Sequence, residues 1–183
     1  MSSTHRFTRA TLAGAACAGL LTLGMALPAS ADTTGGTPAT ITITGGSLSI
    51  TVPSSTASLG SRANTVGGGT ISGPLGEVQV SDARSAAAGS GWGATVISSA
   101  FIPPAGTAIA ASAVSYHAGA ITKVGTATYT ANDPGDLTAV SPAVTATGIT
   151  GDNSATWNPT ISVVVPGGMA AGVYAATITH SVA

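Results

Sequence analysis

The chain has 183 residues, of which 44% are hydrophobic and only 6% are charged, and its formal net charge is −1. No cluster of Lys and Arg is available to neutralise phosphates, which excludes nucleic acid as a partner. Intrinsic disorder is disfavoured, because disordered chains are rich in charged residues and poor in apolar ones. The composition therefore predicts a folded domain whose polar surface consists mainly of Thr, Ser, Asn and Gly.

A cleaved signal peptide is predicted for residues 1–31. Two arginines precede an apolar run over residues 10–27, Pro28 ends this run, and Ala29-Ser30-Ala31 has the small-x-small pattern of a cleavage site. The mature protein is therefore expected to be secreted, with no transmembrane segment. Residues 32–38 are expected to form a short flexible N-terminus.

Two alternatives to cleavage stay open. The apolar run has about the minimum length for an uncleaved membrane anchor, although three glycines dilute it. Cys17 is a candidate for lipid attachment, but the three residues before it lack the large aliphatic residue typical of such sites.

Cys17 is the only cysteine, so the mature part has neither disulfides nor thiolate ligands. About 150 residues are enough for one self-sufficient core. We therefore expect a single domain over residues 39–183.

Short alternating runs between Gly, Pro and Asx turns predict β-strands along this domain. Ala39–Thr44 and Ser47–Val52 flank Gly45-Gly46 and predict a hairpin. A Ser- and Gly-rich loop over residues 54–69 follows. The next strand is Glu77–Asp82, whose two valines share one face.

The remaining elements are predicted mostly as strands. In chain order they are a short helical turn at Ala83–Ala88, strands at Gly91–Phe101, Ala110–His117 and Lys123–Thr130, a turn over residues 132–136, and strands at Thr156–Val165 and Val173–Val182. The predicted fold class is all-β, a single antiparallel β-sandwich of the Ig-like, Greek-key type.

Alternation also separates the two faces of individual strands. On the last strand, Tyr174, Ile178 and His180 share a face, which we interpret as the core face. The same rule places His117 outward, and Tyr116 and Tyr129 inward.

Three segments resemble the WxL domain, a cell-wall-associated surface domain of Gram-positive bacteria: Leu75–Arg84 (LGEVQVSDAR), Gly91–Val96 (GWGATV) and Ala171–Val182 (AGVYAATITHSV). The front hairpin over Ile43–Pro53 also suits the opening of that family. Two motif positions depart from it. Ala94 stands where the first W-x-L has Leu, and His180 stands where the second has Trp.

The resemblance implies non-covalent attachment to peptidoglycan or another wall polymer, often beside a membrane-anchored partner of the same surface system. No sortase-type motif or apolar tail follows the last strand, so covalent anchoring is not expected. The candidate wall-binding residues are Asp82, Arg84, Trp92, Trp157, Tyr174 and His180.

Each aromatic or charged candidate also has a structural interpretation. A large aromatic on a strand either fills the core or stacks on a sugar ring. We favour the core for Trp92. For Trp157 both interpretations stay open, because Asn158-Pro159 follows it and a position near a strand start would leave it partly exposed. Asp82 and Arg84 are interpreted as a surface ion pair at a strand end, which would contribute little stability.

No enzymatic activity is expected. Glycosidases need two carboxylates that face one bond, but Glu77 and Asp82 face opposite sides of a strand. Loop oxygens suit Ca²⁺, and the candidates are Asp133, Asp136, Asp152 and Asn153. Because they lack a known calcium-loop spacing, and because His117 and His180 alone cannot make a zinc site, no metal or cofactor is predicted.

The sequence therefore predicts a secreted surface protein that attaches non-covalently to the cell wall in a structural or adhesive role. One alternative is a carbohydrate-binding module for non-wall glycans, which a row of exposed aromatics would favour. The other is a subunit of a surface assembly joined by strand pairing, which an unprotected Thr-rich edge such as Ala39–Thr44 would favour.

Overall fold

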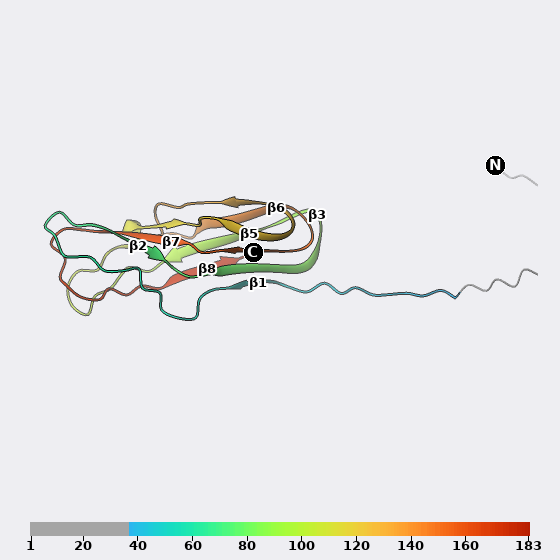
Figure 1. The fold of residues 1–183 in the computed structure, drawn as a ribbon, viewed down its shortest axis with the longest axis horizontal. Coiled ribbons are helices and arrows are strands. Elements are labelled where there is room, and N and C mark those ends of the chain that lie inside the picture. Colours follow the sequence, from blue (N-terminus) through green and yellow to red (C-terminus); the bar gives the residue numbers. More distant parts are fainter. Residues whose placement is uncertain (1–36) are drawn as a thin grey trace, which may run out of the picture. The chain divides into compact units, whose positions relative to one another are not determined.

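The computed structural model describes residues 37–183 (Figure 1). The predicted signal peptide lies outside the described residues. Within them there are eight strands, one 3-10 turn at Ala111–Ala113 and no α-helix, which confirms the predicted all-β class with antiparallel sheets. No helix in this part of the chain is long and apolar enough to cross a membrane.

The strands form two antiparallel sheets. The larger sheet contains, in order, β1 (Leu48–Thr51), β3 (Val78–Ser98), β6 (Ser141–Trp157) and β5 (Ile121–Ala131), with β8 (Ile178–Val182) also paired to β3. The smaller sheet contains β2 (Gly69–Pro74), β7 (Thr160–Val165) and β4 (Val114–His117) in that order.

The three strands of the smaller sheet continue into three strands of the larger one across short breaks. β2 leads into β3 through residues 75–77, β4 into β5 through 118–120, and β6 into β7 through Asn158-Pro159. Pro159 has no N–H to donate to a ladder. The break is held instead by the Leu75 N–H, which donates to the Pro159 oxygen at 2.8 Å, and by the Gly76 N–H, which donates to Asn158 Oδ1 at 3.1 Å.

Beyond its junction with the smaller sheet, the larger sheet bends back on itself. Figure 1 shows β3 turning round at this bend. Between the paired positions at Trp157 and Val144, β6 advances 13 residues, while β3 advances 16 and β5 only 10. The unequal lengths are absorbed by register shifts in the middle of all three strands. Bulges of this kind bend a sheet and increase its twist.

One cluster of buried side chains comes from both sheets. Its members on strands are Val78, Val80, Trp92, Ala94 and Val96 of β3, Ala143, Val144, Ala146, Ile149, Ala155 and Trp157 of β6, Val114 and Tyr116 of β4, and Ile161 and Val163 of β7. The predicted inward face of Glu77–Asp82 is thus confirmed. The inward positions of Tyr116 and, half-buried, of Tyr129 are confirmed as well.

The last strand follows the predicted alternation. Tyr174, Ile178 and His180 are half-buried, as is Ala176 on the same face, whereas the residues that alternate with them, Ala175, Thr177 and Thr179, are exposed. His117 is exposed, as predicted. The strand itself begins only at Ile178, later than the predicted start at Val173.

The predicted front hairpin is wrong. Ser47–Val52 does contain a strand, β1, but Ala39–Thr44 does not, and β1 pairs with β3 instead. Residues 48–51 of β1 pair with the edge of β3, and this pairing lets Leu48 and Ile50 pack against the core. The long loop predicted over residues 54–69 is confirmed up to Gly68, where β2 follows.

The predicted helical turn at Ala83–Ala88 is also wrong, since these residues lie in the bend of β3. Ser85 there has a φ of 54°, a conformation that is incompatible with a right-handed helix. Two strands were not predicted. β2 is rich in glycine, and β6 carries Pro142, Gly148 and Gly151, which hide its alternation.

Candidate functional site

A cleft of about 780 Å³ opens beside the smaller sheet. Two long connections form its walls, residues 52–65 on one side and 166–177 on the other. Asn64 ties the walls together, because its Nδ2 donates to the Met169 oxygen at 2.7 Å. The cleft thus lies between segments that are about 100 residues apart in the sequence.

The floor of the cleft is apolar and continuous with the core. Its buried or half-buried members are Leu59, Leu75, Phe101, Ile109, Val163, Val165, Met169 and Ile178. A pocket with an apolar floor and a few polar groups is the usual form of a ligand site.

The rim of the cleft carries mainly neutral polar groups. Hydroxyls and one amide come from Ser54, Ser55, Thr56, Ser58, Ser61, Asn64 and Thr65. Arg62 is the only charged residue among those that line the cleft. Its Nη2 donates to the Gly68 oxygen at 2.6 Å, and Thr65 Oγ1 donates to the same oxygen at 2.8 Å, so this corner of the loop is fixed.

Two of the predicted site residues, Tyr174 and His180, line this cleft. The Tyr174 hydroxyl donates to the Ala170 oxygen at 2.9 Å, which holds the ring against its own loop. His180 lies deeper, on β8, with its ring centroid 5.6 Å from that of Tyr116.

His180 ends a chain of hydrogen bonds through the core. Trp157 Nε1 lies 2.7 Å from the Tyr116 hydroxyl, which lies 3.2 Å from His180 Nε2. An indole N–H can only donate, so the Tyr116 oxygen accepts from Trp157 and its own proton is free for His180 Nε2. The chain therefore requires a neutral imidazole with an unprotonated Nε2.

Burial also favours the neutral forms of His180 and Tyr116 that this series of hydrogen bonds requires. Desolvation lowers the pKa of His180 to about 4, and it raises the pKa of Tyr116 to about 12 despite the hydrogen bond from Trp157. Both groups are therefore neutral at physiological pH.

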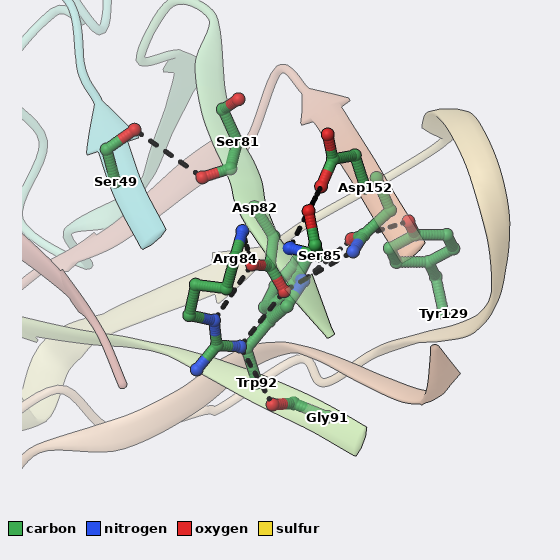
Figure 2. A network of polar contacts seen from close by, with 10 residues as sticks. Ser49, Ser81, Asp82, Arg84, Ser85, Gly91, Trp92, Tyr129 and Asp152 are labelled. Atoms are coloured by element: carbon green, nitrogen blue, oxygen red, sulfur yellow. Dashed lines mark hydrogen bonds and ion pairs between the residues drawn. The ribbon is translucent and has the colours of Figure 1, made fainter. Parts of the chain in front are cut away.

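The other predicted residues lie in the bend of the large sheet (Figure 2). Asp82 is buried, and its carboxylate accepts four hydrogen bonds. Oδ1 accepts from the Arg84 backbone N–H at 3.1 Å and from Arg84 Nε at 2.8 Å, while Oδ2 accepts from Arg84 Nη2 at 2.9 Å and from Asn153 Nδ2 at 3.3 Å. The bonds from Arg84, strengthened by those from its backbone and from Asn153, lower the pKa of Asp82 to about 2 against the opposing effect of burial.

Asn153 connects this pair to the aromatic side chains. Its Oδ1 accepts from Trp92 Nε1 at 3.0 Å and from the Tyr129 hydroxyl at 3.2 Å. The rings of Trp92 and Tyr129 pack at a centroid distance of 5.8 Å and an angle of 55°. Asp82, Arg84, Asn153, Trp92 and Tyr129 are called the bend network below.

Further bonds close the bend around this network. Arg84 Nη2 donates to the Gly91 oxygen at 3.2 Å, across the turn of β3. The Ser85 backbone N–H donates to Asp152 Oδ1 at 3.0 Å, which stabilises the unusual φ of Ser85. Figure 2 shows these side chains converging from β3 and β6.

The six predicted site residues therefore form no single site. Trp92 is buried, as favoured from the sequence, but the partial exposure considered for Trp157 is wrong, because it is only 2% exposed. Pro159 marks a buried sheet break there rather than a strand start at the surface. The Asp82–Arg84 pair exists, but it is not a surface ion pair, because the Asp82 side chain has no solvent exposure.

The acidic turn residues have separate partners. Asp133 bonds to His117 Nδ1 at 2.6 Å, Asp136 caps the turn at Thr138, and Asp152 holds Ser85. Asn153 belongs to the bend network. Among residues 37–183, no three His, Cys, Asp or Glu side chains are grouped as they would be to hold a metal ion.

Sequence reasoning missed most of the cleft. Arg62 and Asn64 lie in a Ser- and Gly-rich loop that carries no motif, and Phe101 was assigned only to a strand end. The one signal available was the length of that loop, because long loops without secondary structure often carry function.

Comparisons of the chain with protein-family models, with curated proteins and with solved structures found no match in any of the three.

Replacing Asp82 by Ala is expected to destabilise the protein by about 3 kcal/mol, because it leaves the Arg84 guanidinium and Asn153 Nδ2 without their shared acceptor. Urea unfolding measures the effect. Asp136→Ala is the matched control, since this exposed carboxylate serves only its own turn, and its effect on stability should be much smaller. Equal effects of the two changes would contradict a special role for the bend network.

The free energy of unfolding should fall as the pH is lowered, because His180 is protonated more readily in the unfolded chain than in the folded one. Its folded pKa is about 4 and its unfolded pKa about 6.5, so the unfolded chain binds more protons between these values. Stability should be constant above pH 6.5 and lower by about 2–3 kcal/mol at pH 4.5. His180→Gln, which keeps an acceptor for Tyr116, should flatten this part of the curve; an unchanged slope in that variant would assign the loss to other groups.

Proposed function

We propose that this protein is a secreted, non-catalytic surface protein that attaches to the cell wall, and that the cleft holds a segment of wall polymer. One observation carries the proposal. Tyr174 and His180, which belong to the closing segment that resembles the WxL domain, both line the large cleft. Two of the six candidate wall-binding residues therefore lie at this cleft.

The chemistry of the cleft fits such a ligand. Peptidoglycan offers hydroxyl, amide, acetyl and methyl groups, and the rim and floor of the cleft present complementary hydroxyls, amides and apolar surface. Arg62 supplies one positive charge for a carboxylate of the peptide part. Trp92 and Trp157 do not contribute, because both are buried and their indole N–H groups are already bonded.

The protein is further proposed to be a single β-sandwich that is exported. A single β-sandwich is supported by the one buried cluster that draws on both sheets, and by Tyr116 of the smaller sheet, which bonds to His180 of the larger one. Secretion rests on the signal sequence over residues 1–31. A module for non-wall glycans is the less favoured alternative, since both tryptophans are buried.

Purified protein is expected to pellet saturably with isolated Gram-positive sacculi. Tyr174→Ala should weaken this binding about tenfold by removing a cleft wall, whereas Val164→Ala, on the exposed face of β7 and outside the cleft, should leave it unchanged. Melting curves of both variants check that they are folded.

Absence of pelleting would refute wall attachment. Pelleting that Tyr174→Ala leaves intact would keep wall attachment but refute the role of the cleft.

A further inference from the structure

The segment before β1 has the pattern of a strand but pairs with no strand among residues 37–183. Residues 40–44 read Thr-Ile-Thr-Ile-Thr, and Ile41 and Ile43 are 90% and 82% exposed. Alternation would place both isoleucines on one face of a strand, about 7 Å apart. Two large apolar side chains exposed side by side in an uncharged, β-branched segment are typical of a strand that pairs with another chain.

An open edge of the large sheet has the same pattern. Residues 126–130 of β5 read Thr-Ala-Thr-Tyr-Thr, and among the described strands β5 ends the order and pairs only with β6. The three threonines are exposed, whereas Ala127 and Tyr129 pack against the core but remain only half-buried. This edge therefore leaves part of the hydrophobic face uncovered.

The neighbouring strand, β6, also has threonines opposite those of β5. Thr126, Thr128 and Thr130 lie opposite Thr150, Thr147 and Thr145 of β6, and Tyr129 lies opposite Ala146. The outer face of the sheet is thus a ladder of paired threonines, and the inner face is apolar. Paired Thr side chains and aromatic–β-branched pairs are both favourable across strands.

We propose that residues Ala39–Thr44 of one copy add as a strand to the outer edge of β5 in a second copy. Its threonines extend the threonine ladder by one row, and Ile41 and Ile43 cover the half-exposed inner edge beside Ala127 and Tyr129. Backbone hydrogen bonds of the added strand satisfy the free edge of β5.

The protection that usually prevents such pairing is absent from this part of β5. Charged side chains and prolines normally protect an edge strand. Residues 126–131 contain neither, and the single lysine of β5, Lys123, lies before the register shift between Val124 and Thr126. The donor segment is also uncharged, so no repulsion opposes the contact.

The topology makes this contact directional. The donor segment leads into β1, and Gly46 and Ser47 are still bonded to Ala83 of β3. The acceptor β5 lies at the opposite edge of the same sheet, with β3 and β6 between them. Donor and acceptor are different surfaces, so each copy can bind one neighbour at each edge, and the assembly is an open head-to-tail chain.

Sedimentation velocity over a concentration series tests the proposal. The wild-type protein should form a ladder of oligomers that grows with concentration. A donor variant with Ile41→Ser and Ile43→Ser should weaken self-association by about tenfold or more, because two buried isoleucines are lost. An acceptor variant with Thr126→Lys and Thr130→Lys should have the same effect.

Two matched controls should associate like wild type. Val66→Ser removes a side chain that is 98% exposed in the loop after β1, and Thr70→Lys adds a charge to an exposed position of β2. All changed side chains are exposed, so melting temperatures should stay close to wild type.

Mixing the two monomeric variants gives the decisive result. The donor variant keeps an intact β5 and the acceptor variant keeps an intact Ala39–Thr44, so an equimolar mixture should form dimers and nothing larger. A monomeric wild type, oligomers that survive both variants, or a mixture without dimers would each overturn the proposal.

This result is independent of wall attachment, because Tyr174→Ala should still assemble and both monomeric variants should still pellet with sacculi.

Discussion

The buried carboxylate of Asp82 is the constraint on which the shape of the large sheet depends. A carboxylate without solvent contact keeps its charge only if its lone pairs are all engaged. Asp82 achieves this with Arg84, two residues further along β3, and with Asn153 from β6. Asp82 and Asn153 are the last regular pair of the β3–β6 ladder before its first register shift, so the network holds the two strands together where the bend begins. The bend in turn sets which side chains of β3 face the core on either side of it.

The tryptophans extend this constraint through the core. Each indole donates to a partner on another strand, Trp92 to Asn153 and Trp157 to Tyr116. A core with few large residues gains orientation from such directed bonds, because an unpaired buried N–H would be costly. The consequence for function is direct. With both tryptophans engaged inside, the proposed wall-binding site has to rely on the loops, whose polar side chains line the cleft beside Tyr174 and His180.

The alternation of apolar and polar residues predicted those strands that have one solvent-exposed face and one buried face. It gave the inward valines of β3 and the half-buried face that carries His180. It failed for Ala39–Thr44, where the pattern is perfect but the part of the chain that the structure describes holds no partner strand, and for β6, whose glycines interrupt a central strand. The cleft was not predictable for a different reason. It depends on loops far apart in sequence that meet at Asn64 and Met169, and no local pattern encodes such a meeting.

The small number of charged residues explains both the composition of the surface and the uncharged edge of β5. A protein with 6% charged residues must build its wet surfaces from Thr, Ser and Asn, and Thr is also a strong strand former. The same choice that keeps the outer face of the large sheet soluble leaves the edge residues 126–131 of β5 without a charged side chain that would repel another strand. A threonine ladder is self-complementary, since one more row makes the same contacts as the last. In the proposed assembly such an edge would let copies associate by backbone pairing, without an interface built from charges or large apolar patches.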